Sequence, residues 1–346
     1  MNRNFSQWVK GKGPENDIVI SSRIRLARNI EDIPYPNQAE EKDLKKTTEL
    51  IKKLVDKQND FNLKYYNINK LSDIGKKVMV ERHLVSPPHA EGEKSHGVLI
   101  NKDENISIMV NEEDHIRIQI IFPGLQLSSA WKKADEIDDY LEDSLDYAFS
   151  SKWGYLTACP TNMGTGLRAS VMVHLPALNM TNNIDRMLGA VGKLGLAVRG
   201  LYGEGSESVG NIYQISNQIT LGHSEKDILE NLKSVTLQII EQERQARQRL
   251  LKKQEIEVKD KIKRSYGTLK YAYKITNREA LELLSYVKLG IDLEILNNIT
   301  SSLLSELVIL IRPAHLQQIV GKKLTPFERD MKRAELIQEK LNEEVN

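Results

Sequence analysis

Short runs of alternating apolar and polar residues dominate the first 222 positions of the chain. Apolar side chains occupy every second position over 106–110 and again over 116–120, on either side of a polar segment. A period of two residues predicts half-buried β-strands, and the polar segment between them is typical of a hairpin turn. Further strands are predicted from 18, over 78–88, from 153 into a glycine-rich loop, and over 169–175, 196–199 and 212–221. Amphipathic helices are predicted over 40–59, 129–149 and 184–194.

The pattern changes at Ser224, beyond which no strand signal remains. Three segments, which begin at Ser224, Thr276 and Thr325, have a hydroxyl residue followed three positions later by an acid, the capping box of a helix start. The densely charged stretch 241–263 predicts a solvated helix. We therefore predict a lead-in over 1–17, a mixed region over 18–246, and an all-α domain over 255–346 joined by a long helix around 225–254.

The composition of the chain argues against several classes of function. The chain of 346 residues is long enough for two domains, and Lys+Arg 49 against Asp+Glu 48 leaves a net charge of +1. Such a balance argues for neither nucleic acid nor membrane as a partner. The single cysteine, Cys159, excludes an internal disulfide, and no cluster has zinc-ligand spacing. Without an apolar leader or a membrane-length run, the sequence predicts a cytoplasmic protein.

The segment 111–117, Asn-Glu-Glu-Asp-His-Ile-Arg, interrupts the alternating strands with three acids. Clustered acids repel one another, so a cation is expected opposite them. The alternative is an ordinary solvated turn. Near the N-terminus, Arg23 and Arg25 share a face if the strand continues, and phosphate is the natural anion between two guanidinium forks. The alternative there is an exposed strand rich in arginine.

Five arginines stand beside predicted turns: Arg23, Arg25, Arg117, Arg168 and Arg199. Because the chain has no Walker-type Gly-x-x-x-x-Gly-Lys loop, they suggest a triphosphate site built from arginine forks. Cys159 is followed by Pro160 and Thr161, whose hydroxyl is near enough in sequence to hydrogen-bond a thiolate. A lone cysteine is more often a small buried apolar residue. His83, near the end of a predicted strand, is either a ligand contact or an ordinary polar position.

Four segments, 21–25, 111–117, 159–168 and 199–204, resemble in order and spacing the catalytic domain of the ATP:guanidino phosphotransferases, the creatine and arginine kinases. The resemblance covers about Ile18 to Leu221. It implies an α+β fold of the phosphagen-kinase type over 18–246, with an antiparallel sheet flanked by helices as in glutamine synthetase, followed by the all-α C-terminal domain.

Two departures from that family refine the resemblance. Only 17 residues precede the matching region, so the N-terminal helical domain that closes over small guanidino substrates is expected to be absent. A helical C-terminal extension is present instead, with Arg329-Asp330-Met331-Lys332-Arg333-Ala334 near its end. Both features resemble the bacterial kinases that phosphorylate arginine side chains of proteins. In those kinases this motif implies phosphoarginine binding by Arg329, Asp330 and Arg333. The alternative is a charged helix face compensated by Glu328 and Asp330.

The resemblance also implies residue roles. Glu113 is expected to be the general base, Glu112 to hold another guanidinium nitrogen or to help position the metal, and Cys159 to contact the guanidinium as a thiolate; the sequence alone does not separate the two glutamates. ATP and Mg²⁺ are the implied cofactors, with no protein metal site. The residues implied to bind ATP are Ser21, Ser22, Arg23, Ile24, Arg25, His83, Arg117, Arg168, Ala169, Ser170, Val171, Met172, Arg199, Gly200, Leu201, Tyr202, Gly203 and Glu204.

Partners follow from the same resemblance. They are protein substrates bearing arginine, including a stress-response repressor and misfolded proteins, a zinc-binding activator protein, a Clp ATPase-protease and a second copy of the chain. Neither nucleic acid nor membrane is expected. Two rival functions remain at this point: a kinase for small guanidino compounds, and a phosphoarginine-binding adaptor with little kinase activity.

Overall fold

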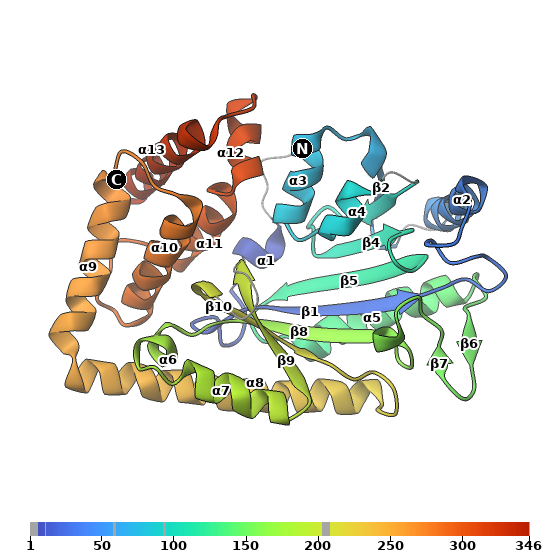
Figure 1. Cartoon of the computed structure of the whole chain (residues 1–346), viewed down its shortest axis with the longest axis horizontal. Helices are drawn as coiled ribbons and strands as arrows, with labels where there is room; N and C mark the ends of the chain where they lie inside the picture. The colour runs from blue at the N-terminus through green and yellow to red at the C-terminus, as the bar shows by residue number, and fades with distance from the viewer. Residues whose placement is uncertain (1–5, 11, 58–59, 93–94, 203–207, 346) are drawn as a thin grey trace.

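An eight-stranded antiparallel sheet forms the centre of the computed structural model, which describes residues 6–10, 12–57, 60–92, 95–202 and 208–345 (Figure 1). In their order across the sheet, the strands are β2 (Lys64–Asn67), β3 (Gly97–Ile100), β4 (Ile106–Val110), β5 (Ile116–Pro123), β1 (Val19–Arg28), β8 (Leu167–His174), β10 (Ser208–Asn217) and β9 (Leu196–Tyr202). A separate small hairpin joins β6 (Phe149–Ser150) to β7 (Gly154–Tyr155).

Helices account for most of the remaining described chain. Those associated with the sheet are α1 (Gln7–Lys10), α2 (Glu41–Lys57), α3 (Asp73–Glu81), α4 (Pro87–Glu91), α5 (Leu127–Glu142), α6 (Pro176–Met180), α7 (Ile184–Lys193) and α8 (Glu225–Lys253). Those that follow are α9 (Glu255–Tyr271), α10 (Asn277–Asp292), α11 (Ser301–Leu310), α12 (Pro313–Val320) and α13 (Pro326–Val345). Short 3₁₀ turns cover Ile68–Lys70 and Pro160–Asn162.

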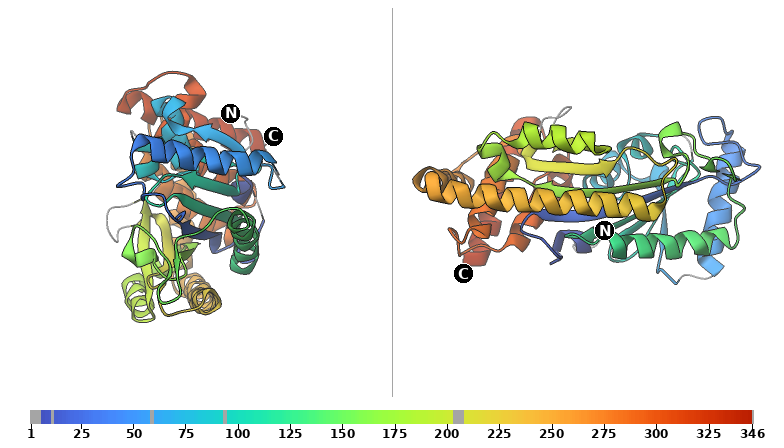
Figure 2. Two further views of the ribbon diagram at one scale, coloured as in Figure 1. Left: turned by 90° about the vertical axis from the view of Figure 1, so that its right-hand side faces the viewer. Right: turned by 90° about the horizontal axis from the view of Figure 1, so that it is seen from below.

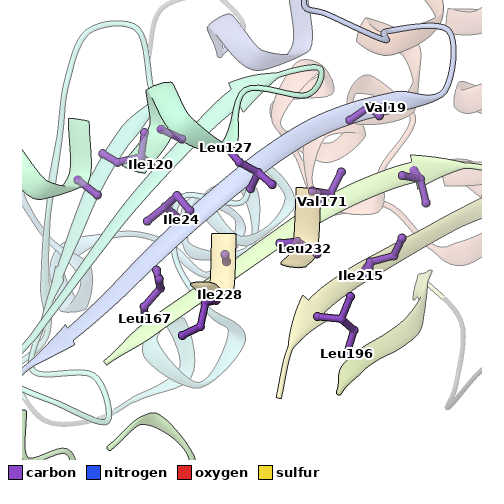
Figure 3. Close-up of a cluster of buried hydrophobic side chains, with 14 of the residues drawn as sticks. Val19, Ile24, Ile120, Leu127, Leu167, Val171, Leu196, Ile215, Ile228 and Leu232 are labelled. Atoms are coloured by element: carbon purple, nitrogen blue, oxygen red, sulfur yellow. The ribbon is translucent and has the colours of Figure 1, made fainter. Parts of the chain in front are cut away.

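One face of the sheet is packed throughout. Alternate residues of the central strands, among them Ile24, Ile120 and Val171, are fully or almost fully buried against α5, α7 and α8 (Figure 3). Figure 2 shows the long helix α8 running across the sheet. Because side chains alternate between the two faces of a strand, burial of these positions directs their neighbours to the opposite face.

The opposite face is covered only in part. Met109 of β4 and Val98 of β3 pack with α3 and α4 over one side of the sheet. Ile121 of β5 packs with Trp8 of α1 and Ile309 of α11 at one end. Between these two covers, the middle of the sheet carries polar and charged side chains, and this is where the predicted chemistry lies.

The helices α9–α13 gather at one end of the sheet, away from α2 and the β6–β7 hairpin (Figure 1). They have an apolar cluster of their own, which includes Leu284, Leu307 and Ile337. The core under the sheet also continues into them through Val258, Ile262 and Leu289. The sequence-based division at residue 255 remains a prediction.

Several contacts fix this helical region against the sheet and α3, and two of them are especially close. At Gly210, which has a φ of +68°, an added Cβ would lie 2.8 Å from the Leu281 carbonyl oxygen of α10, so only glycine allows this approach. On the other side, Glu81 at the end of α3 accepts hydrogen bonds from the backbone amides of Ala314 and His315 at 2.8 and 2.9 Å. Its carboxylate therefore caps the N-terminus of α12.

Several element predictions need correction. The predicted strand over 78–88 is wrong: α3 runs from Asp73 to Glu81 with Ser72 as its N-cap, and Ser86 caps α4 with proline at its start. The helix predicted over 129–149 ends earlier, at Glu142. The stretch 241–263 is divided at Gln254 between two helices and is not wholly solvated, because Glu243 and Arg247 are buried.

We expect Leu232→Ala in α8 to destabilise the fold by about 2–5 kcal/mol, because it opens a cavity beneath the sheet. Leu232 is fully buried, whereas Leu237 on the same helix is 43% exposed. Leu237→Ala is the matched control and should cost less than about 1 kcal/mol. Urea unfolding followed by circular dichroism measures both, and equal effects would contradict this assignment of the core.

Candidate active site

The register of the sheet brings the predicted arginines to one face. Arg25 of β1 lies directly opposite Arg168 of β8, and Ala27 of β1 lies opposite Arg117 of β5. Residues directly opposite on adjacent strands share a face, as do residues two apart on one strand. Arg23, Arg25, Arg117 and Arg168 therefore all project from the incompletely covered face.

Arg199 joins this face through two further pairings. It lies opposite Gln214 of β10, which lies opposite Met172 of β8. Arg23 crosses the same strands, donating to the Gln214 side-chain oxygen at 2.7 Å and to the Ser170 hydroxyl at 3.3 Å. All five predicted arginines thus share one surface.

This surface has an excess of positive charge at its centre. Burial, and then the charges of neighbouring guanidinium groups, hold the pKa of Arg25 well below its ordinary value. Burial, followed by the charges of Arg199 and Arg117, likewise lowers the pKa of Arg168. The Nε atoms of Arg25 and Arg168 are buried and have no hydrogen-bond partner among the described residues. Unpaired donors and mutual repulsion are the features that suit a multivalent anion.

The acid pair stands at one edge of the arginine face, in the turn between β4 and β5. Arg117 Nη1 lies 2.8 Å from Glu112 Oε2, and Arg117 Nη2 lies 3.1 Å from Glu113 Oε2. The Ser86 hydroxyl and the Glu113 amide also donate to Glu112. Burial alone raises the pKa of Glu112, but these partners outweigh it and leave that pKa below its ordinary value. The expected cation opposite the acids is therefore Arg117.

A hollow of about 310 Å³ joins the two charge sets. Its walls include Glu112, Glu113, Cys159, Arg25 and Arg168. The Cys159 Sγ atom lies 3.0 Å from the Thr161 hydroxyl, the contact expected from the sequence. An acid pair, a thiol and guanidinium groups thus line one cavity, an arrangement that suits the transfer of a phosphoryl group to a cationic acceptor.

The other members of the 111–117 segment hold the structure around this cavity. Asp114 is fully buried and accepts from the Ala158 amide and the Asn29 side chain, both at 2.7 Å, so it anchors the chain directly before Cys159. Burial raises its pKa. His115 Nδ1 accepts from the Ile30 amide at 3.0 Å. Both side chains are buried, and neither lines the cavity.

Arg28 is a component that the sequence-based analysis missed. Its buried guanidinium pairs with Asp138 of α5 at 2.6 Å, donates to the Thr165 carbonyl at 3.0 Å, and lies 3.5 Å from the centre of the Tyr155 ring. It fixes the end of the loop that carries Cys159. Gly166, with φ +65°, passes so close that an added Cβ would lie 2.6 Å from the Ala27 carbonyl oxygen. Its position in the strand could have revealed this role, because Arg28 lies two residues after Leu26 and shares a face with the apolar residues Ile24 and Leu26.

His83 adopts a left-handed conformation with φ 59° and packs edge-on against Trp8 at 5.5 Å between ring centroids. Both side chains line a small hollow together with Ser21, Arg23 and Met172. Burial, and then the charges of Arg312 and Arg23, lower the pKa of His83 to about 3, so its ring is neutral at physiological pH. It therefore adds no charge to the arginine face.

The predicted nucleotide residues divide between the two faces of the sheet. Ser21, Ser170 and Met172 lie on the arginine face with Arg23, Arg25, Arg117, Arg168 and Arg199. The side chains of Ile24, Ala169 and Val171 lie in the core, and Ser22 donates to the Gly124 carbonyl, so these four offer only backbone groups. Gly200, Leu201 and Tyr202 belong to β9. Gly203 and Glu204 lie outside the described residues.

The Arg329–Arg333 segment lies on α13, and its two arginines differ. Arg333 is buried and donates to the carbonyls of Ile311 and Ile275, both at 2.8 Å, and to Asp330 at 2.6 Å. Arg329 is half-buried and donates to the Leu324 carbonyl. Arg333 therefore holds α13 against the preceding helices, and Arg329 and Asp330 are the more accessible members of the motif.

No group of three His, Cys, Asp or Glu side chains that could hold a metal ion occurs among the described residues. Within the same part of the chain, no single helix is long and apolar enough to cross a membrane; the pair α11 and α12 passes that test by length and composition but is bent by 84°.

Comparison with known proteins agrees with this geometry. Residues 44–246 match the ATP:guanido phosphotransferase C-terminal catalytic domain. A solved lombricine kinase is 25% identical with a TM-score of 0.59, covering 70% of this chain and 73% of its own. The substrate-free duplicated taurocyamine kinase of Schistosoma mansoni is 28% identical with a TM-score of 0.58, covering 70% of this chain and 36% of its own. The chain belongs to the ATP:guanido phosphotransferase family.

The helical region identifies the branch. Residues 255–346 match the C-terminal domain of the protein-arginine kinase McsB. Protein-arginine kinases of Halothermothrix orenii and Bacillus subtilis are 61% and 50% identical over 342 and 345 residues, which cover 99% of this chain in both comparisons and 98% and 95% of those relatives. The activity is therefore ATP-dependent phosphorylation of arginine in proteins, as the resemblance had implied.

We expect Arg28→Met to destabilise the protein by about 3–5 kcal/mol, because it leaves the charge of Asp138 buried and unpaired. The double variant Arg28→Met/Asp138→Leu removes both charges and should recover part of that loss. Urea unfolding of both single variants and the double variant gives the coupling energy. Strict additivity of the two single effects would show that the buried pair does not act as a unit.

Proposed function

We propose that the arginine face binds the triphosphate of MgATP and that Glu112 and Glu113 bind the guanidinium of the arginine to be phosphorylated. The observation that carries this assignment is the position of Arg117, whose guanidinium lies between the two carboxylates at 2.8 and 3.1 Å. The acid pair thus already accommodates a guanidinium group, and the cavity beside it is lined by Arg25 and Arg168.

Arg117 links the two halves of the reaction. With no nucleotide bound, it neutralises the acid pair and competes with an incoming substrate guanidinium. A triphosphate on the adjacent face offers Arg117 a stronger partner, since phosphate oxygens accept bidentate hydrogen bonds from a guanidinium. Transfer of Arg117 from the acids to the nucleotide frees both carboxylates for the substrate. Nucleotide binding therefore favours substrate binding.

Glu113 is our candidate for the general base. Its side chain is 44% exposed, whereas that of Glu112 is 7% exposed and also bonded to Ser86, so Glu113 is the more accessible to an entering side chain. A guanidinium has a pKa above about 12, and it becomes a nucleophile only when a proton leaves. One guanidino nitrogen attacks the γ-phosphorus, the bond to the β-γ bridging oxygen breaks, and Glu113 takes the proton while ADP departs.

The remaining groups stabilise charge and orientation. Arg25, Arg117 and Arg168, which share one face, stabilise the negative charge on the equatorial oxygens of the transferring phosphoryl group. The Nε atoms of Arg25 and Arg168, which have no hydrogen-bond partner among the described residues, are suited to donate to polyphosphate oxygens. Mg²⁺, when bound with ATP, neutralises further charge on the phosphates. Cys159, at the wall of the same cavity, faces the substrate guanidinium and orients it without forming a covalent bond.

We extend the proposal to the cellular role that the family resemblance implies. The substrates then include a stress-response repressor and misfolded proteins, phosphoarginine directs them to a Clp ATPase-protease, and a zinc-binding protein activates the kinase in the cytoplasm. Binding of phosphoarginine at Arg329, Asp330 and Arg333 is supported by the accessibility of Arg329 and Asp330. A homodimer is supported by exposed Tyr271, Tyr273, Phe327 and Met331 on the helical region.

We expect Glu113→Gln to lower phosphorylation of a protein substrate by about 10²- to 10⁴-fold, because the amide cannot accept the guanidinium proton. The label should be acid-labile, as a phosphoramidate is, and nucleotide binding should be retained. Glu257→Gln, on an exposed part of α9, is the control. Label that resists mild acid would exclude arginine as the acceptor, and equal turnover of free arginine would favour the small-molecule rival.

The role of Arg117 predicts coupled binding. An arginine-bearing peptide should bind about 5- to 10-fold more tightly in the presence of a non-hydrolysable ATP analogue with Mg²⁺, because the analogue removes Arg117 from the acid pair. Calorimetric titration with and without the analogue measures the change. Reciprocity requires the peptide to tighten analogue binding by the same factor. Independent binding of the two ligands would contradict this role of Arg117.

A further inference from the structure

Large apolar side chains are exposed beside the loop that carries Cys159. Phe149 and Trp153, on the β6–β7 hairpin, are 58% and 42% exposed, and Leu221, after β10, is 39% exposed. The three side chains line one hollow of about 310 Å³, which we call the aromatic hollow. Contiguous exposed apolar groups of this kind mark interaction sites more often than isolated ones do.

The hairpin that bears two of these side chains is rigidly mounted. Strands of two residues are not stable alone, and here Tyr155 of β7 exchanges backbone hydrogen bonds with Gly164 at 2.8 and 3.3 Å. The Tyr155 ring lies over buried Arg28 at 3.5 Å and packs edge-on against Phe149 at 5.3 Å. A buried ion pair therefore fixes an exposed aromatic side chain, which limits the entropy lost when a ligand binds.

The aromatic hollow and the catalytic cavity share one loop. Cys159, Asn162 and Gly166 line the catalytic cavity, whereas Gly164 and Thr165 line the aromatic hollow. Thr220, which also lines the hollow, donates to the Thr161 and Met163 carbonyls at 3.0 and 2.6 Å and so ties the two sites together. The aromatic hollow and the catalytic cavity therefore lie along the same short loop.

We propose that the aromatic hollow binds a large apolar side chain of the substrate polypeptide, located a few residues from the arginine that is phosphorylated. The occupant is a segment of the substrate because one loop, 159–166, lines both the aromatic hollow and the catalytic cavity, and because the substrates are proteins. Its charged rim is mixed, with Lys152, His223 and Glu225, so apolar contact with Phe149, Trp153 and Leu221 decides the preference. The inference rests on the proposed binding of arginine by Glu112 and Glu113.

Such a site would favour unfolded segments. In a folded protein, large apolar side chains are mostly buried, whereas in an unfolded chain they are accessible next to arginine. Aromatic side chains that fill a preformed hollow commonly dominate the affinity of an interface. The aromatic hollow thus selects substrates by an apolar side chain near the arginine, whereas the acid pair contacts only the guanidinium.

The test compares peptides that carry one arginine and one phenylalanine, with the phenylalanine scanned through positions on both sides of the arginine, against the same peptides with serine in its place. We expect the best phenylalanine peptide to exceed its serine counterpart about tenfold in kcat/KM, mainly through KM. The double variant Phe149→Ser/Trp153→Ser should lower the phenylalanine peptide to the level of the serine peptide. Both side chains are exposed, and thermal unfolding checks that the double variant stays folded.

Ile256→Ser is the matched control, because it removes an exposed apolar side chain of α9 that is 80% exposed and lies outside both sites. This variant should keep the full preference for phenylalanine. The proposal is overturned if phenylalanine gives no advantage at any position, or if its advantage survives in the double variant. If serine peptides are phosphorylated and Glu113→Gln abolishes their labelling, the proposed catalytic assignment stands whatever the fate of the aromatic hollow. If no peptide is phosphorylated, both proposals fall together.

Discussion

Repulsion among guanidinium groups on one face of the sheet is the constraint around which this protein is built. The antiparallel register places Arg25 opposite Arg168, and burial then weakens the screening that water would provide. Such an arrangement persists only because the other face is packed against α5 and α8, which holds the strands in register. Glu112 and Glu113 form ion pairs with Arg117. In the proposed site, the triphosphate of ATP balances the charge of the other arginines.

The same alternation that forms the site also explains what the sequence could predict. Period two revealed the strands on either side of the acidic turn and the shared face of Arg23 and Arg25. The same two-residue period also places Arg28 on the core face of β1. A buried arginine on that face must have a buried partner. That partner, Asp138, is 110 residues away, and no local pattern identifies it. Long-range pairs of this kind are a product of the fold, and sequence alone does not reveal them.

Other errors in the sequence-based analysis came from short or mixed patterns. The run Val78-Met79-Val80 is too short to separate strand from helix, and the Ser72 cap was the stronger signal. The charged segment of α8 was interpreted as solvated because most of its residues are polar. Glu243 is nevertheless buried, since its carboxylate accepts from the backbone amides of Ala177 and Leu178 at 3.0 and 2.9 Å. The pattern of apolar and polar residues along the sequence does not reveal a buried charge that is stabilised by such partners.

One connection between the helical region and the sheet runs through the segment that carries His83. Glu81, the last residue of α3, caps α12, and His83 follows two positions later in a left-handed turn whose carbonyl accepts from Gln119. A shift of α12 would therefore move the chain that carries His83. On the other side, Arg333 ties α13 to the Ile311 carbonyl just before α12. The segment with α12 thus connects α13 to the small hollow lined by His83.

The exposure of Glu113 bears on why the acceptor is a protein. Glu113 is nearly half exposed, and an ion pair in contact with water contributes only up to about 1 kcal/mol. A free guanidino compound held mainly by such contacts would bind weakly. An arginine that is part of a polypeptide brings backbone and neighbouring side chains, which extend the contact beyond the cavity without changing the chemistry inside it. In the proposed site, affinity for the substrate therefore comes largely from surfaces next to the acid pair, and the carboxylates bind the guanidinium weakly enough for the product to leave.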